Sequence, residues 1–292
     1  MKLFSHRFGG DWTTKKLERL RKYLAAYVKI MSKQHFTFAY IDAFAGTGYR
    51  TLKTPENTGE LLFPELAAQD SQRFLDGSAR IALQVEPHFD KYIFIEKDDN
   101  KIVELEKIKD EFPTVRDRID IVNEEANKYI IGLCARNWEK HRAVMFLDPF
   151  GMQVTWPTIK AVGDTQAIDL WLLFPLGIAV NRLLKRDGNI DENWKQKLDD
   201  IFGESSWYDA FYQTISTRDL FGEVSQIQKT GNFESIGSYF VNRLKTVFVD
   251  VAKNPLPLCN SKNIPLFLLC FACANPKGAK TAIKIAQDIL KP

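Results

Sequence analysis

The chain has 292 residues, of which 45% are hydrophobic, and its 40 Lys and Arg nearly balance its 37 Asp and Glu. This length and composition suit one large α/β domain with an insertion, or two small domains, and they exclude a disordered chain. The formal net charge of +3 gives no global nucleic-acid signature, although a local basic patch remains compatible with it.

Short apolar runs alternate with amphipathic segments along most of the chain. Residues 12–32 are predicted to form a helix, because apolar side chains recur there at helical spacing with Lys and Arg between them. Strands are predicted over 36–41, 92–95, 119–122, 143–147 and 168–174, and helices over 77–84 (with Ser78 as N-cap), 100–109 and 124–138. This alternation predicts an α/β fold with a mostly parallel sheet and helices on both faces.

Two stretches interrupt this pattern. Residues 49–77 are polar, and they are interpreted either as a functional lid or as a solvated surface insertion. Residues 181–245 are charged and aromatic, and we expect them to be a helical insertion for substrate or partner recognition. A late strand over 265–274 and a helix over 277–290 then complete an α/β domain made of residues 1–180 and 246–292.

Four consecutive predicted strands each deliver a carboxylate at their carboxyl end. These carboxylates belong to Asp42, Glu96, Glu125 and Asp148. In open α/β sheets, ligands bind in the crevice outside the carboxyl ends of the strands. We therefore expect the four side chains to share one site.

The cofactor is predicted from the turn that follows Asp42. Gly46-Thr47-Gly48 lets the backbone approach a ligand closely, and Glu96 suits the two hydroxyl donors of a ribose. The third glycine of a dinucleotide fingerprint is absent, and so is a P-loop. Asp42 suits a cationic ligand better than a phosphate. The pattern therefore favours S-adenosylmethionine (SAM), which carries an ammonium and a sulfonium, over NAD or ATP.

A candidate catalytic loop follows the strand over 143–147. Asp148-Pro149-Phe150 resembles the (D/N/S)-P-P-(Y/F) loop of amino methyltransferases, although the second proline is missing and the aromatic residue comes one position early. In such a loop a carboxylate and a backbone carbonyl accept hydrogen bonds from an amino group, while the aromatic ring stacks on a planar acceptor. The alternative interpretation is that Asp148-Pro149 merely ends a strand and turns the chain.

Several segments in this order resemble the three-Cys-motif partner proteins (TcmP), a prokaryotic methyltransferase-like family found beside a gene for a three-cysteine-motif protein. The resemblance is carried by residues 40–48 (YIDAFAGTG), 89–96 (FDKYIFIE), 146–151 (FLDPFG), 169–175, Asn181-Arg182 and 274–278 (ANPKG). It implies the Rossmann-like class I SAM-dependent methyltransferase fold, with a seven-stranded type of sheet, and a three-Cys-motif protein as a partner.

The same resemblance implies roles for individual residues. Asp42, Phe44, Gly46 and Gly48 would line the methionine end of SAM, and Glu96 would hold its ribose. Glu125 falls where the family places an Asp near the adenine amino group, but the usual D-A-N is Glu125-Ala126-Asn127 here.

Two functions from different classes follow. The first is a SAM-dependent methyltransferase that modifies an amino nitrogen, with a nucleobase in RNA or DNA as the expected acceptor; a base within a duplex would have to be flipped out. The second is a SAM- or nucleic-acid-binding partner subunit without turnover of its own. An NAD-linked oxidoreductase is disfavoured by the missing third glycine, and cytosine-C5 chemistry by the absence of a cysteine near Pro149.

The remaining patterns give weaker signals. Cys270-x-x-Cys273 is interpreted as two core residues on opposite faces of a strand rather than as part of a metal site, and no metal site is predicted. Trp207-Tyr208 and Phe211-Tyr212 could stack on a base or pack within the insertion. The basic helix over 12–32 could contact phosphates or be a solvated face.

Features of the whole chain indicate its compartment. Four cysteines are too sparse for a disulfide framework. The first residues lack the apolar stretch of a secretory leader, and the longest apolar run, residues 168–180, is too short to span a bilayer. We therefore expect a cytoplasmic protein without a membrane partner.

Overall fold

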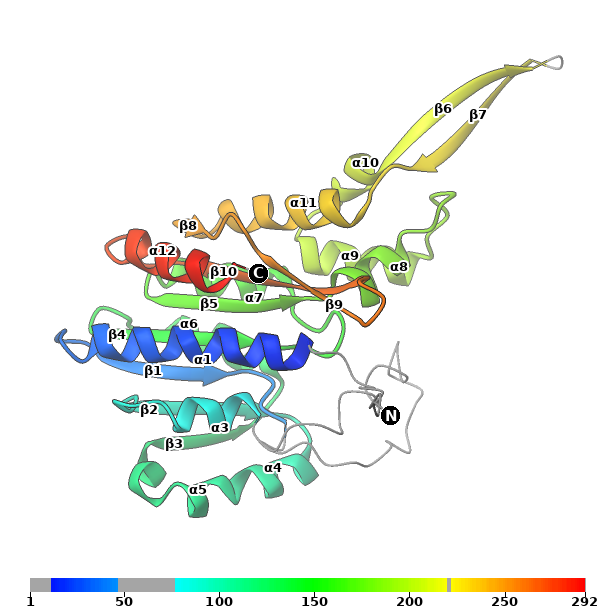
Figure 1. The fold of residues 1–292 in the computed structure, drawn as a ribbon. Coiled ribbons are helices and arrows are strands. Elements are labelled where there is room, and N and C mark those ends of the chain that lie inside the picture. The colour runs from blue at the N-terminus through cyan, green and yellow to red at the C-terminus, as the bar shows by residue number, and fades with distance from the viewer. Residues whose placement is uncertain (1–11, 47–76, 220–221, 292) are drawn as a thin grey trace, which may run out of the picture.

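The computed structural model describes residues 12–46, 77–219 and 222–291 of the chain. Figure 1 shows a twisted sheet between two layers of helices, with a hairpin that projects from one end. Among the described helices, none combines the length and the apolar character that crossing a bilayer requires.

Within these residues the sheet has eight strands in the order β3-β2-β1-β4-β5-β10-β8, with β9 paired to β10. The strands are β1 (Thr37–Asp42), β2 (Lys91–Glu96), β3 (Ile119–Asn123), β4 (His141–Leu147), β5 (Ile168–Phe174), β8 (Asp250–Val251), β9 (Leu256–Cys259) and β10 (Pro265–Cys273). The first five strands are parallel, whereas β10 runs antiparallel to its neighbours. This topology confirms the predicted Rossmann-like class I methyltransferase fold.

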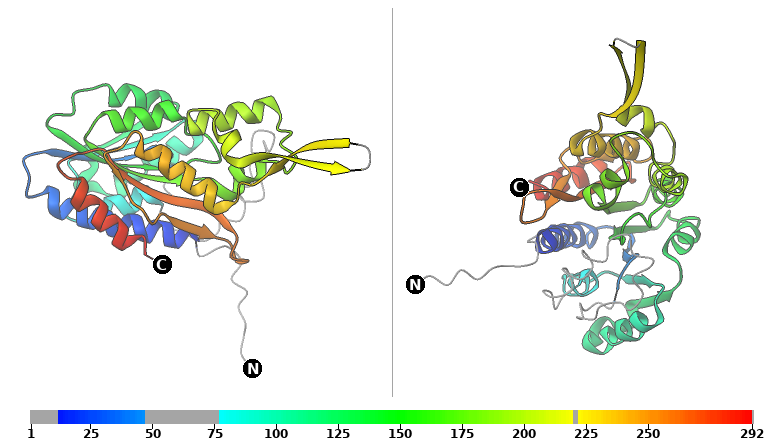
Figure 2. Two further views of the ribbon diagram at one scale, coloured as in Figure 1. Left: turned by 90° about the horizontal axis from the view of Figure 1, so that it is seen from above. Right: turned by 90° about the vertical axis from the view of Figure 1, so that its right-hand side faces the viewer.

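Helices cover both faces of the sheet (Figure 2). One face carries α1 (Trp12–Met31), α3 (Ser78–Leu83), α4 (Asp99–Glu106), α5 (Ile108–Glu111) and α12 (Ala279–Ile289). The other carries α6 (Ala126–Cys134), α7 (Trp156–Asp164), α9 (Glu192–Phe202), α10 (Trp207–Phe211) and α11 (Phe233–Lys245). A 3₁₀ helix (Pro113–Arg118) precedes β3, and a π-helical turn (Leu176–Val180) and α8 (Asn181–Leu183) follow β5.

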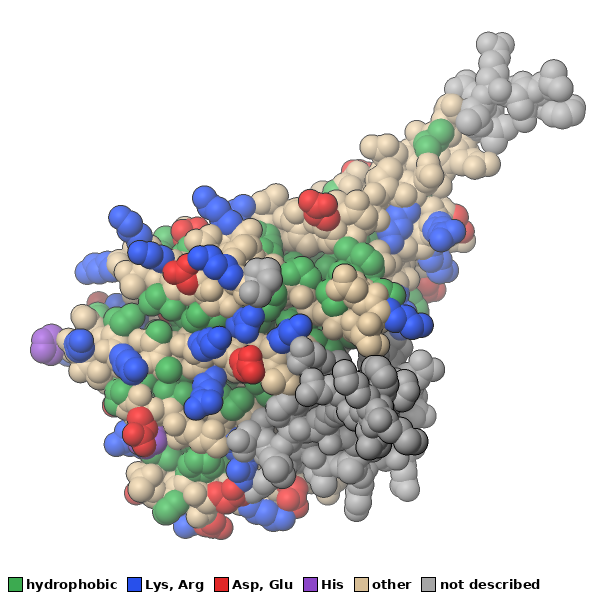
Figure 3. All heavy atoms as spheres, in the orientation of Figure 1, with side chains coloured by type: hydrophobic (Ala, Val, Ile, Leu, Met, Phe, Trp, Pro, Cys, Tyr) green, Lys and Arg blue, Asp and Glu red, His purple; other side chains and the backbone are tan. Residues whose placement is uncertain are grey.

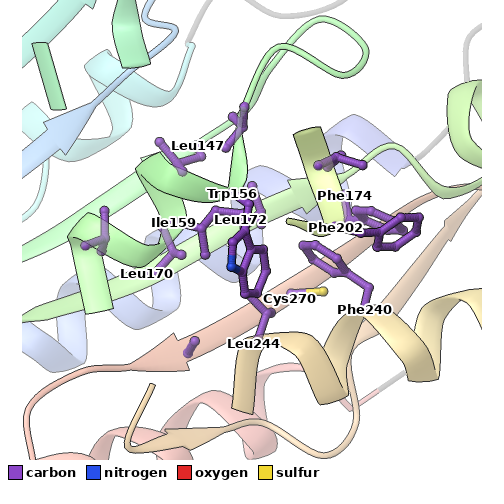
Figure 4. Packing of buried hydrophobic residues seen from close by; sticks show 14 of the residues in the cluster. Leu147, Trp156, Ile159, Leu170, Leu172, Phe174, Phe202, Phe240, Leu244 and Cys270 are labelled. Carbon is purple, nitrogen blue, oxygen red and sulfur yellow. The ribbon is translucent and has the colours of Figure 1, made fainter. Parts of the chain in front are cut away.

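The apolar core forms two clusters, one on each face of the sheet. Strand residues alternate between them, so the buried Cys270 belongs to one cluster and the buried Cys273 to the other. The prediction that these cysteines lie on opposite faces is therefore confirmed. In Figure 4 the rings of Phe174, Phe202 and Phe240 lie together, and the centroids of Phe174 and Phe240 are 3.9 Å apart.

The helix over 12–32 and the strands up to residue 174 are confirmed to within a few residues. The capping prediction is wrong, because Gly77 is the N-cap of α3 and makes no side-chain capping bond. The Ser78 hydroxyl instead hydrogen-bonds to Asp42. The polar segment over 49–77 lies outside the described residues except for its last residue.

The predicted helical insertion contains helices and also a two-stranded antiparallel hairpin. Strands β6 (Tyr212–Asp219) and β7 (Gly222–Lys229) pair, among the strands that the structure describes, only with each other, and they extend away from the sheet in both views of Figure 2. The prediction of a helical segment is wrong here. β-branched residues such as Thr214, Ile215 and Ile227 recur in these strands and favour extended backbone.

Packing, not base stacking, accounts for most of the aromatic residues at the start of this hairpin. Trp207, Phe211 and Tyr212 are buried, and the Trp207 indole donates a hydrogen bond of 2.6 Å to Asp199. The Tyr212 ring stacks on that of Tyr208 with a centroid distance of 4.6 Å. The Phe211 ring also lies 5.2 Å from that of Tyr239 on α11, so these contacts hold the base of the hairpin against α9 and α11.

Candidate active site

The candidate site lies at the carboxyl ends of β1, β2, β3 and β4. From β1 the strand order runs through β2 to β3 at one edge of the sheet, whereas β4 and β5 follow in the opposite direction. The carboxyl ends of β1 and β4 therefore form a topological switch point. Asp42 and Glu96 end β1 and β2, and Asp148 immediately follows β4. Glu125 lies just beyond β3, at the start of α6. The fold thus brings the predicted carboxylates to one edge.

Asp42 is fully buried beneath the β1 turn. Its carboxylate accepts hydrogen bonds from the Tyr40 hydroxyl at 3.1 Å and from the Phe44 backbone N–H at 3.4 Å, and from Ser78. Burial raises the pKa of Asp42 to about 6, and the charge of Asp148 adds to this rise while the hydrogen bonds oppose it. Asp42 therefore supports the turn from below, and its predicted contact with the cofactor stays a prediction.

Acidification to about pH 5 is expected to stabilise the fold through Asp42 and Asp169. Burial raises the pKa of each carboxyl to about 6, above its unfolded value of about 4. Between these values the folded state binds more protons than the unfolded state, so the free energy of unfolding rises as the pH falls through 6. Each group then contributes about 1 kcal/mol at pH 5. Denaturant unfolding between about pH 4 and pH 6 measures this change. In the variant Asp42→Asn, the free energy of unfolding should depend on pH about half as steeply as in the wild type. An unchanged pH dependence would contradict the raised pKa of Asp42.

Gly46 and Glu96 form a direct link between the first two strand ends. Gly46 has a φ of 63°, which a residue with a side chain rarely adopts, and its N–H donates to Glu96 Oε2 at 3.1 Å. The other carboxylate oxygen, Oε1, accepts from the N–H groups of Lys97 and Asp98 at 2.9 and 3.0 Å. These backbone donors hold the carboxylate in one orientation, and Oε2 retains capacity for a further donor.

Glu125 caps α6 rather than standing free. Its carboxylate accepts from the N–H groups of Asn127 and Lys128 at 3.0 and 2.8 Å and from the Asn127 amide at 2.8 Å. Partial burial opposes ionisation, but these hydrogen bonds prevail and lower the pKa of Glu125. The Asn127 amide also donates to the Gln153 carbonyl at 2.9 Å, which ties this strand end to the loop after β4.

Asp148 forms an ion pair with a buried lysine that the sequence analysis did not place here. Lys16 Nζ lies 2.5 Å from Asp148 Oδ2, and the Lys16 side chain is 2% exposed against 22% for Asp148. The ammonium also lies 5.2 Å from the ring centroid of Trp12. Lys16 is therefore part of the site, and not of the solvated face or the phosphate-contacting surface predicted for this helix.

The loop after Asp148 presents an aromatic ring. Phe150 is 54% exposed, and its N–H donates to the Gln153 side chain at 3.1 Å. Lys101 Nζ lies 5.5 Å from the centroid of this ring and 3.7 Å from Glu96 Oε2, so one cation connects the loop to the end of β2. Gly151 turns the chain with a φ of 70°.

The structure brings together most of the predicted site residues. Phe44 is half-buried and packs against the core, and Pro149 is buried in the loop between Asp148 and Phe150. Gly48 lies outside the described residues. Among the described residues, no group of three or more His, Cys, Asp or Glu side chains is arranged to hold a metal ion.

The strand order and the carboxylates at this edge define the class of fold, a Rossmann-like methyltransferase fold. No protein-family model and no curated protein matches the chain. The resemblance to the three-Cys-motif partner proteins therefore stays a prediction.

Solved structures match the chain at low sequence identity. Protein LPL1258 from Legionella pneumophila is 12% identical with a TM-score of 0.48, and the match covers 98% of this chain and 92% of that one. Spermidine synthase from Thermotoga maritima is 12% identical with a TM-score of 0.42, covering 94% and 72%. A methyltransferase from Geobacter sulfurreducens is 12% identical with a TM-score of 0.31, covering 72% and 78%. The topology of the sheet, and not these matches, carries the assignment of the fold.

Proposed function

We propose that the protein is a SAM-dependent methyltransferase that transfers a methyl group to an amino nitrogen of a nucleobase or a related planar acceptor. The observation that carries this proposal is the Glu96 carboxylate, fixed by the backbone N–H groups of Gly46, Lys97 and Asp98 at the switch point of the sheet. A carboxylate in this place, beside a turn with positive φ, suits the ribose of a nucleoside cofactor.

The acceptor would bind at the loop that follows β4. An amino group would donate one hydrogen bond to Asp148 Oδ1 and another to the Pro149 carbonyl, which aims its lone pair at the methyl group. The exposed ring of Phe150 would stack on the acceptor. When SAM is bound it supplies the electrophilic methyl group, so the protein contributes mainly positioning and exclusion of water.

Lys16 fits this arrangement as a positioning residue. Its ammonium binds Asp148 Oδ2 at 2.5 Å, which leaves the second oxygen for the acceptor.

The substitution Glu96→Gln is expected to weaken SAM binding about 10- to 100-fold, because it removes a charged acceptor from the ribose diol. Isothermal titration calorimetry measures this directly. Glu104→Gln on α4, which removes an exposed carboxylate paired with Lys107, is the matched control and should bind as the wild type does. Failure of the folded wild type to bind SAM would refute the proposed function.

The Lys16–Asp148 ion pair also favours a second candidate function. Because one oxygen of Asp148 is already bound to an ammonium, the loop would serve only to end β4 and turn the chain, without binding an acceptor. The protein would then be a SAM- or nucleic-acid-binding subunit without turnover that acts with a three-Cys-motif protein. Binding of SAM with no methyl transfer, even when that partner is added, would support this second function.

A further inference from the structure

Basic residues are concentrated in the first and last described helices. α1 and residues 275–291, which include α12, contain ten of the 40 Lys and Arg but two of the 37 Asp and Glu. The rest of the chain is therefore net negative. The two helices pack side by side, and Arg19 Nη2 donates to the Lys291 carbonyl at 3.2 Å. The fold thus gathers cations from both ends of the sequence on one surface.

The cations form two exposed stripes, which we call the α1–α12 face. On α1 they recur every seven residues, opposite the buried apolar side of the helix. The stripes consist of Lys15, Lys22 and Lys29 on α1, and Lys280, Lys284 and Lys291 on α12. Figure 3 shows Lys and Arg side chains spread over both helices on the same side of the molecule.

Few acidic side chains neutralise this face. Glu18 lies 3.7 Å from Arg19, and Asp288 lies 2.7 Å from Lys291. Within the part of the chain that the structure describes, no ion pair engages Lys22, Lys29 or Lys284. A face with many exposed cations and few acidic side chains is the electrostatic footprint that a polyanion requires.

The α1–α12 face is continuous with the candidate site. Lys15 precedes Lys16, whose ammonium binds Asp148 at the end of β4. α1 therefore runs from the loop of the proposed acceptor across the face of the sheet (Figure 1). A long acceptor held at Asp148 would extend over this face.

We propose that the α1–α12 face binds the phosphate backbone of double-stranded nucleic acid. This inference rests on the proposed function, for which it names the acceptor. The aromatic residues of α1 (Trp12, Tyr23 and Tyr27) are buried, so the described residues of this face offer no ring on which unpaired bases could stack. The apolar sides of both helices are packed on the core, which removes the apolar surface that a membrane-bound helix needs.

The test is fluorescence anisotropy of the full chain with a labelled DNA duplex and an RNA duplex of the same sequence, over a series of salt concentrations. The variant Lys22→Gln/Lys29→Gln/Lys284→Gln removes three exposed charges. The matched control, Lys128→Gln/Lys160→Gln/Lys245→Gln, removes three from the opposite layer of helices. We expect the first variant to bind at least about 10-fold more weakly, with a salt slope reduced by about 2 to 3, and the control to bind within about 2-fold of the wild type.

Three outcomes would overturn the proposal: equal losses in the two triple variants, no duplex binding by the wild type at low salt, and stronger binding to vesicles containing phosphatidylserine than to either duplex. Calorimetry with SAM separates this inference from the proposed function. If duplex binding depends on the α1–α12 face while SAM does not bind, the methyltransferase proposal is refuted, but the proposed nucleic-acid surface is supported. If SAM binds and the duplex does not, the proposal that the α1–α12 face binds nucleic acid is refuted, and the methyltransferase proposal is retained.

Discussion

Asp148→Asn is expected to lower methyl transfer at least about 100-fold while leaving the SAM affinity within about 3-fold of the wild type. The Asn side chain keeps the shape of the carboxylate, and its oxygen can still accept a hydrogen bond from Lys16. Its amide nitrogen, however, is a hydrogen-bond donor at the position of Asp148 Oδ1, which receives a hydrogen bond from the amino group of the substrate. The reacting nitrogen of the substrate is therefore misplaced. Transfer of labelled methyl groups from SAM to plasmid DNA and to total RNA measures the effect.

The control for this experiment is Asp164→Asn. Asp164 ends α7, is 59% exposed and pairs with Lys160, so its replacement should change neither rate nor affinity. Wild-type turnover in Asp148→Asn would show that the loop does not orient the acceptor. A wild type that binds SAM but methylates neither nucleic acid would favour the second candidate function.

Asp148→Ala is expected to destabilise the fold by about 3–5 kcal/mol, far more than Lys16→Met does. Removal of the carboxylate leaves the Lys16 ammonium, 2% exposed, without its counter-charge. Removal of the lysine leaves Asp148, which is 22% exposed and can be hydrated, and methionine retains the packing volume. Guanidinium unfolding gives both free energies.

The double variant Lys16→Met/Asp148→Ala completes this cycle. Its free energy of unfolding should lie within about 1–2 kcal/mol of the wild-type value, because an apolar replacement of a buried pair removes the cost of desolvating both charges. Additive losses would show that the two side chains do not interact. They would also refute the positioning role proposed for Lys16, but they would not affect the roles proposed for Glu96 and Gly46.

The parallel half of the fold could be predicted because its signals are local. β5 was predicted over its full length, and β1 and β4 to within a few residues, since each is a short and largely apolar run. The antiparallel direction of β10 and its position between β5 and β8 depend on pairing between segments that are far apart in the chain. No periodicity of the sequence reports such pairing.

The site was predicted as a set of strand ends, but not as a set of contacts. Lys16 could have been placed, because it stands four and seven residues before the buried Leu20 and Tyr23 and so shares their side of α1. Its partner Asp148 is 132 residues away, which no local pattern indicates. Likewise the burial of Asp42 depends on Ser78 and on the way α3 packs over β1.

The hairpin was missed because the segment before it gives a helical signal. Trp207–Phe211 do form a short helix, and the change to extended backbone occurs at Tyr212. Beyond that residue, Gln213 to Ser216 are exposed, so the hairpin lacks the apolar alternation by which a half-buried strand is recognised. Its strands can be read from β-branched content alone, which is a weak signal.

The separation of the β6–β7 hairpin from the core has a consequence for where the chain tolerates changes in length. Phe202 and Phe240 pack with Phe174 of the central sheet, so α9 and α11 cannot be shortened without opening the core. Beyond Tyr212, the hairpin strands pair with each other and with no other strand in the described part of the chain. Residues can therefore be added or removed there in facing pairs, such as Ser216 with Ser225, while the register of every other strand stays the same. Relatives of this protein are expected to differ in length at this hairpin first.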